Sequence, residues 1–91
     1  MRAVDLLAQA AQLVVTDRAR QHGDAHECHR TIARLWTAYL GRNLGAVDVA
    51  RMMVLLKLAR SLSGELNVDD FRDMAGYAAL AGEFAEQESA Q

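Results

Sequence analysis

The stretch that decides the fold is "DVARMMVLLKLAR", residues 48–60, which is apolar on nearly every side of a helix yet carries Lys57 and Arg60. A helix that is apolar all round is typical of a central element enclosed by other helices. We therefore expect a helix over about 47–62 at the centre of the fold. At roughly 100° per residue, Lys57 and Arg60 project within about 60° of each other, so the two cations share one face of that helix.

The composition of the chain favours an all-α fold. Of the 91 residues, 52% are apolar but only 5% are aromatic, and proline is absent. The apolar content is mostly Ala, Leu, Val and Met, three of which are good helix formers, and the glycines fall mainly where the periodic pattern pauses. A chain of this length buries a thin core, which a partner subunit often completes. We expect a single all-α domain over residues 1–91 that forms an oligomer.

Apolar residues at helical spacing predict four helices. Short connections between them favour antiparallel neighbours, so we expect a compact four-helix antiparallel bundle in which the third and fourth helices form a hairpin. The apolar stripe of the first helix is wider than one neighbour covers, which indicates a second contact in another subunit. The predicted helices lie at about 3–19, 25–40, 47–62 and 68–86.

The second predicted helix has an apolar side that we expect to be buried. Arg30 and Arg34 project away from that side. Asp24, three residues before Glu27, is predicted to cap the N-terminus of the helix, and a cap beside a loop can also line a site. The expected buried residues are Cys28, Ile32, Leu35, Trp36 and Tyr39.

The histidine-rich segment at the start of this helix raises the question of a metal site. His22, His26, Cys28 and His29 match no closed four-ligand zinc pattern, and they diverge around the helix. We therefore expect no bound metal here. His26 is expected to be exposed and Cys28 to fill the core. His22 belongs to the preceding loop, toward which Arg18 points, and both are candidate ligand-binding residues.

Charge and length exclude several classes of protein. The formal net charge of −2 argues against duplex DNA as a partner, because neutralising several phosphates requires a basic face. The longest uncharged stretch is far shorter than the roughly 20 residues that span a membrane, and no basic segment precedes an apolar one at the N-terminus. A single cysteine excludes a disulfide within these residues and suits a reducing compartment. We expect a cytoplasmic protein without membrane contact.

The fourth predicted helix carries polar residues on its inward side. Asp73 lies within the apolar side, whereas Arg72 and Glu83 point away from it. Tyr77, one turn after Asp73, could stack on a planar ring or donate its hydroxyl, although a half-buried core aromatic is the usual role. Gly76 in mid-helix costs about 1 kcal/mol relative to alanine, which close helix approach, space for a ligand, or a neutral substitution would each explain.

An inward carboxylate needs a partner, because burying it alone costs on the order of several kcal/mol. Lys57 and Arg60 on the third helix are the natural partners of Asp73. In one interpretation these groups form ion pairs between helices that are purely structural. In the other, they line a polar pocket between the third and fourth helices, where the cations bind an anionic group such as phosphate.

Three segments in this order resemble a family of small proteins common in tailed bacteriophages and prophages: "RQHGDAHECHRTIARLWTAYLG", "DVARMMVLLKLAR" and "DDFRDMAGYAAL". Members of that family carry a Tyr-Gly-Asp-like loop, a Met-Met-rich helix with Lys and Arg, and an Asp-x-x-Asp-x-x-Gly-Tyr helix. The resemblance covers about residues 17–83. His22 stands where Tyr is more typical of the family, and Cys28 where Asn is frequent.

The pattern is also distantly similar to the nucleotide-modification-associated domains of phages and to the all-α MazG-like nucleotide pyrophosphatases. This similarity implies nucleotide handling. MazG-like enzymes bind magnesium through acids on two helices, because metal neutralises the triphosphate before water attacks. Asp70 and Asp73 match the later acidic pair, whereas Lys57 and Arg60 stand with Met53 where the earlier pair would be. Cations there would hold phosphate directly.

Three functions remain open from the sequence. The first is a phage nucleotide-binding protein that needs no cofactor, with Lys57 and Arg60 on phosphate, Tyr77 on the base or sugar, and Asp24 and Asp73 orienting the cations. It would sequester a nucleotide signal of host defence or serve phage nucleotide metabolism. The second is a magnesium-dependent hydrolase using Asp70, Asp73 and Asp24. The third is an oligomeric adaptor or inhibitor that binds a host protein through the first helix.

Overall fold

The computed structural model describes residues 1–17 and 24–90, and this part of the chain is all-α. It contains a short α1, a π-helical turn η1 that continues it, and three longer helices. None of the helices in these two segments is both long and apolar enough to cross a lipid bilayer. The elements are α1 (Ala3–Gln12), η1 (Leu13–Asp17), α3 (Ala25–Leu40), α4 (Ala46–Ser61) and α5 (Asp69–Ser89).

The ends of the helices follow local signals in the sequence. Asp24 caps α3, because its Oδ2 accepts a hydrogen bond of 3.2 Å from the Glu27 N–H. Gly41 ends α3 with a left-handed φ of 72°, a conformation that glycine adopts without a steric penalty. Before α5, the side chain of Asn67 accepts a hydrogen bond of 3.0 Å from the Asp69 N–H. Asp24 and Asn67 therefore set where α3 and α5 begin, and Gly41 sets where α3 ends.

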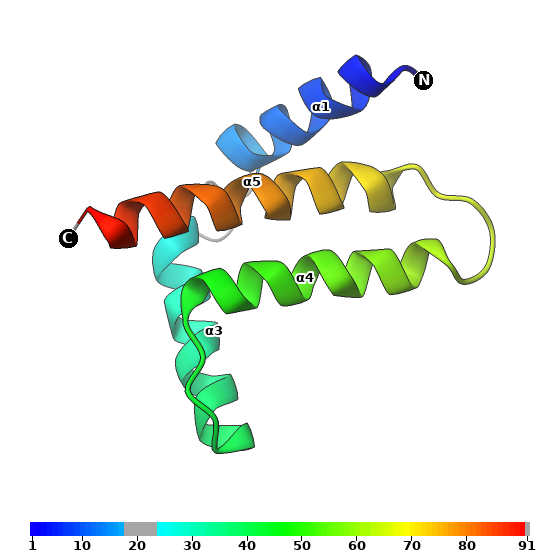
Figure 1. Cartoon of the computed structure of the whole chain (residues 1–91). Helices are drawn as coiled ribbons and strands as arrows, with labels where there is room; N and C mark the ends of the chain where they lie inside the picture. The colour runs from blue at the N-terminus through cyan, green and yellow to red at the C-terminus, as the bar shows by residue number, and fades with distance from the viewer. Residues whose placement is uncertain (18–23, 91) are drawn as a thin grey trace.

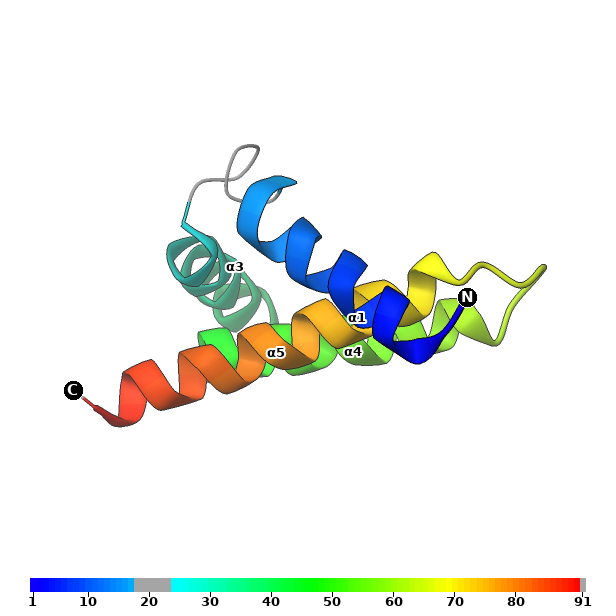
Figure 2. The same ribbon diagram turned by 90° about the horizontal axis from the view of Figure 1, so that it is seen from above.

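The central feature of the fold is an antiparallel hairpin of α4 and α5 (Figure 1). Figures 1 and 2 show α1 lying against α5, on the side away from α4. In contrast, α3 runs steeply across the N-terminal end of α4 (Figure 1). The expected bundle of four antiparallel helices is therefore not confirmed, although the all-α class is. The short α3–α4 connection reverses the chain but does not force the two helix axes to be parallel.

The core lies between α4 and α5 and is closed by α3. Phe84 on α5 is completely buried, and its ring stacks on His26 at a centroid distance of 4.7 Å and an interplanar angle of 10°. The ring of His29 is tilted against the same phenylalanine at 5.0 Å. Short side chains on α4 let α5 approach closely. The buried core cluster consists of Ala46, Ala50, Tyr77, Leu80 and Phe84.

The prediction of which side of α3 is buried was wrong. Leu35 and Tyr39 are 65% and 89% exposed, and the buried residues are instead His26, His29 and Ala33. The two imidazoles can be buried because each finds a hydrogen-bond partner. His26 Nε2 lies 2.9 Å from Glu88 Oε2, and His29 Nδ1 lies 2.8 Å from the Ala25 carbonyl oxygen. The expectation that His26 is exposed is therefore also wrong, and Cys28 is half-buried rather than in the core.

Replacing Phe84 tests whether this aromatic contact organises the core. We expect Phe84→Leu to lower the free energy of unfolding by about 1–2 kcal/mol, because it removes the stacked ring and leaves unfilled space. Phe71→Leu is a matched control on the same helix, since Phe71 is 45% exposed, and should change stability by less than about 0.5 kcal/mol. Urea denaturation followed by circular dichroism measures both. Equal effects of the two substitutions would contradict the placement of the core.

Gly76 offers a second test, because the structure leaves room for a methyl group there. A Cβ added at Gly76 would lie 3.5 Å from Val14 Cγ2, which is ordinary van der Waals contact. We expect Gly76→Ala to raise the free energy of unfolding by about 0.5–1 kcal/mol, since alanine loses less entropy in a helix. Gly82→Ala, where a Cβ meets open space, should give a similar gain. If thermal melts showed that Gly76→Ala destabilises the protein and Gly82→Ala does not, α5 and η1 would have to lie closer together than an alanine at position 76 allows.

Candidate functional site

An ion pair joins the C-terminal half of α4 to the first turns of α5. Lys57 Nζ lies 2.9 Å from Asp73 Oδ2, and the two side chains are 15% and 12% exposed. Asp73 faces inward on α5 because it shares the side of the helix that carries the buried Tyr77 one turn later. The two charges therefore meet in a largely desolvated position between the helices.

The second partner of Asp73 is Arg72 and not Arg60. Arg72 Nε donates a hydrogen bond of 3.0 Å to Asp73 Oδ1, and Arg72 Nη2 lies 3.0 Å from the same oxygen. Arg72 Nη1 also lies 3.5 Å from Asp69 Oδ1, one turn earlier. The expectation that Arg72 points away from this side was wrong, because its long side chain bends back to the neighbouring carboxylate. The sequence did hold a signal for this arrangement, because the three-residue spacing of Asp69 and Arg72 places an acid and a cation on one face of a helix.

The pairing determines the protonation state of Asp73. Burial of the carboxylate raises its pKa, but the hydrogen bonds and charges of Lys57 and Arg72 outweigh burial and hold the pKa below its ordinary value of 3.8. Each carboxylate oxygen has its own cationic partner, with Oδ2 bonded to Lys57 and Oδ1 to Arg72. Asp73 is therefore a charged anchor that fixes the positions of two cations.

These side chains line one edge of an open groove of about 610 Å³ between the end of α4 and the beginning of α5. Its volume lies within the roughly 300–1,000 Å³ that is usual for small-molecule sites. Arg60 is exposed at the rim and forms no ion pair within residues 1–17 and 24–90. The polar lining consists of the cations Lys57, Arg60 and Arg72, the acids Glu65, Asp69, Asp70 and Asp73, and the neutral Ser63 and Asn67.

Some of the residues predicted for the site lie elsewhere. Tyr77 is buried in the core, where its ring is tilted against that of His29 at a centroid distance of 6.2 Å, and it does not line the groove. Asp24 caps α3 and is likewise absent from the groove lining. Arg18 and His22 lie outside the described residues. The structure thus brings together Lys57, Arg60 and Asp73 from the predicted set.

The acids of the groove are poorly arranged for a metal ion. In the part of the chain that the structure describes, no three His, Cys, Asp or Glu side chains are grouped closely enough to hold one. Asp70 and Asp73 line the same groove, as the hydrolase hypothesis requires. However, both oxygens of Asp73 already bond cations, so a metal at Asp73 would have to displace Lys57 or Arg72.

Comparison with known proteins places this all-α chain among phage proteins. It is 41% identical over 78 residues to the Gene 55 protein of Mycobacterium phage L5, and 37% identical over 73 residues to the Gene 55 protein of Mycobacterium phage D29. These alignments cover 85% and 80% of the chain but 50% and 48% of the relatives. The chain therefore spans about half the length of the curated relatives it matches.

The family itself is shown by a match over residues 5–85 to the family described as "Domain of unknown function (DUF6378)". The chain belongs to this family. No solved structure matches it. The resemblance to an uncharacterised phage protein family is thus confirmed, whereas the resemblance to MazG-like proteins receives no support from these matches.

The lowered pKa of Asp73 predicts a specific acid sensitivity. Since its pKa is lower in the folded state, the unfolded chain takes up the proton first as the pH falls. The stability that Asp73 contributes is present above about pH 4 and is lost as the pH falls through the lower pKa of the folded state. Asp73→Asn should remove this component, so the difference in unfolding free energy between wild type and variant should shrink between about pH 5 and pH 2.

Urea denaturation at each pH measures this difference. Glu83→Gln is the control, because Glu83 lies exposed on α5 and forms no ion pair in the described ranges. It should leave the acid dependence of stability almost unchanged. A difference between wild type and Asp73→Asn that stays constant with pH would contradict the ionic role of Asp73.

Proposed function

We propose that the chain is a phage protein that binds a nucleotide, or another phosphate-bearing small molecule, in the groove between α4 and α5. The observation that carries this proposal is the position of Arg60. Arg60 lines the groove without an ion-pair partner among the described residues, and two further cations held in place by Asp73 line the same groove. Arginine presents a planar fork of donors that matches phosphate in a bidentate manner.

The fixed position of Arg72 also supports phosphate binding. Asp73 holds its Nε and Nη2, so the guanidinium is ordered before a ligand arrives and loses little further entropy on binding. The same carboxylate keeps Lys57 at the groove edge. A phosphate between Arg60 and Arg72 would therefore meet a partly preorganised pair of cations.

The acidic residues narrow the class of ligand. The groove lining carries four carboxylates and three cations, so a ligand that is anionic all over would be repelled from part of it. A nucleotide carries phosphate at one end and hydroxyl or amino donors on its sugar and base. Asp69 and Asp70 lie at the groove and could accept hydrogen bonds from such donors. Tyr77 and Asp24 take no part in this proposal, since neither lines the groove.

The phage relatives give the proposal a setting. A nucleotide-binding protein made in the cytoplasm of an infected host would sequester a nucleotide signal of host defence or serve phage nucleotide metabolism. In the hydrolase alternative, Asp70 and Asp73 would bind magnesium after Lys57 and Arg72 move away. In the adaptor alternative, the exposed apolar residues of α1, which include Val4 and Leu7, would contact a host protein.

Thermal melting against mono-, di-, tri- and cyclic nucleotides, with and without magnesium, distinguishes these functions. A ligand at 100 times its Kd stabilises by about 2.7 kcal/mol, which should raise the Tm of a domain of this size by roughly 10 °C or more. We expect such a shift without metal for at least one nucleotide. Arg60→Gln should weaken the affinity for that nucleotide at least tenfold. The Tm of the free variant should stay within about 2 °C of that of the free wild type.

Arg51→Gln is the matched control, because Arg51 is an exposed arginine on the same helix and does not line the groove. It should keep the full nucleotide response. A response that survives Arg60→Gln would place the ligand elsewhere. Turnover that depends on magnesium would support the hydrolase, and the absence of any shift across the panel would favour the adaptor.

A further inference from the structure

The outer face of α4 has the residue spacing of a helix that pairs with another helix. Met52, Leu55 and Ala59 on α4 and Leu62, the residue that caps its C-terminus, follow one another at intervals of three, four and three residues, and all four are exposed. This spacing repeats the apolar seam of a coiled coil. Lys57, which lies between them in the sequence, turns the opposite way and bonds Asp73 on α5. We call these four residues the α4 seam.

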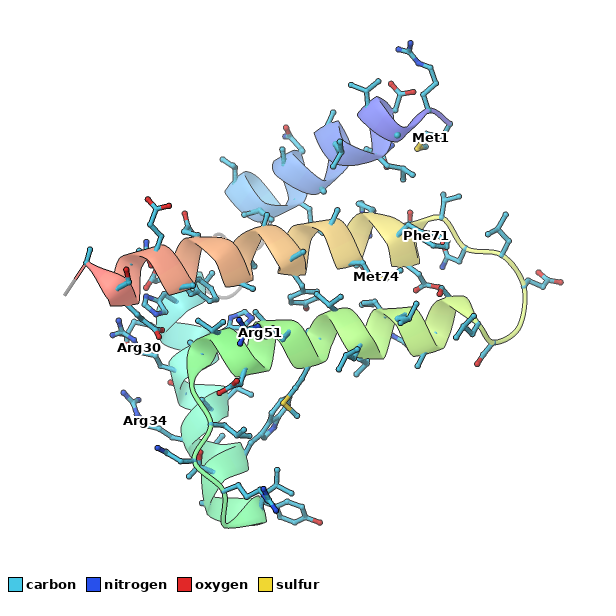
Figure 3. All side chains as sticks on the ribbon, in the orientation of Figure 1. Met1, Arg30, Arg34, Arg51, Phe71 and Met74 are labelled. Atoms are coloured by element: carbon cyan, nitrogen blue, oxygen red, sulfur yellow. The ribbon has the colours of Figure 1, made fainter. Side chains whose placement is uncertain are left out.

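A second apolar surface borders the same space. Ile32, Leu35, Trp36 and Tyr39 lie on the side of α3 opposite Arg34, and we call them the α3 stripe. Figure 3 shows Arg34 pointing away from the angle between α3 and α4. The α3 stripe therefore faces into that angle. Figure 1 shows that α3 descends on the side of α4 away from α5. The α4 seam lies on the same side, because it is opposite Lys57, which bonds Asp73 on α5. Seam and stripe together form an open apolar corner.

The corner exposes several large apolar side chains to solvent. Leu55 and Leu62 are 62% and 81% exposed, and the stripe adds the large side chains of Leu35 and Tyr39. With Met52, these side chains expose an area on the order of the 800 Å² that one partner buries in a stable complex. Water is an unfavourable neighbour for a surface of this size.

From the seam spacing and the area, we infer that the occupant of the corner is a second copy of this chain, whose α4 lies antiparallel along the α4 seam. A two-fold axis near Lys57 sets Leu55 opposite Ala59 of the second copy, and Met52 opposite Leu62 of the second copy. A large side chain then faces a small one at the centre of the contact, which allows close packing.

The direction of pairing follows from the position of α3. Because α3 projects at the N-terminal end of α4, a parallel arrangement would bring both projecting segments to the same end (Figure 1). In the antiparallel arrangement, each α3 stripe instead lies beside the C-terminal end of the other copy's α4. Both apolar surfaces of the corner are then covered by one symmetric contact. Arg60 projects to a different side of α4 from Leu55, whereas Ala59 also lines the groove, so the dimer contact and the groove adjoin at Ala59.

Sedimentation equilibrium of the whole chain tests the inference. Wild type should have twice the mass of the chain at micromolar concentration, and Leu55→Glu should weaken the dimer by roughly 100-fold or more, since a charge would be buried in each half of the contact. Leu7→Glu is the matched control. Leu7 is 60% exposed on α1, close to the 62% of Leu55, and its substitution should leave the dimer intact.

Leu62→Glu provides a second variant at the end of the α4 seam and should also weaken the dimer. Circular dichroism should show unchanged helical content for all three variants, because each replaced side chain is largely exposed in the single chain. A wild-type protein that is monomeric throughout the concentration range would overturn the inference. So would dissociation by Leu7→Glu with a dimer that survives Leu55→Glu, since the copies would then meet through α1.

Discussion

The antiparallel contact between α4 and α5 is the interaction on which the other elements depend. Both α1 and α3 pack against this hairpin, and the buried cluster around Phe84 lies within it. Short alanines on α4, opposite the aromatic and leucine side chains of α5, let the two helices approach closely. The Lys57–Asp73 ion pair then fixes how far one helix has slid along the other, because a shift of one turn would leave a charge without its partner.

Polar groups hold α5 at both ends. At its beginning, Asp73 bonds Lys57 of α4, and near its end Glu88 bonds His26 of α3. Arg30 also lies 3.3 Å from His26 Nδ1, and since arginine can only donate, that nitrogen accepts the hydrogen bond. His26 Nε2 therefore carries the proton that it donates to Glu88. The histidine pair of α3 thus serves the fold, by covering Phe84 and by linking α3 to the last turn of α5.

Much of the fold follows from the sequence because helical periodicity and caps are local signals. The cap at Asp24 and the inward direction of Asp73 are examples, and the second helps to place the candidate groove. The expectation that α4 is enclosed by other helices was wrong, because Leu55, Leu56 and Leu58 are exposed. The errors concern choices that depend on tertiary contacts. The apolar pattern favoured burial of Leu35 and Tyr39 over that of two histidines, because a pattern cannot show that His26 finds Glu88 62 residues later. Arg72 was missed for the same reason, since its contact depends on how its side chain bends.

The double attachment of α5 has a mechanical consequence. Asp73 and Glu88 are 15 residues apart, which is about 22 Å along a straight helix. A rod fixed at two such points cannot slide or tilt at one end without straining the other. A ligand that pulled Asp73 away from Lys57 would therefore strain the hydrogen bond between His26 and Glu88 near the C-terminal end of α5. Through α5, a movement at the groove is therefore transmitted to the first turn of α3.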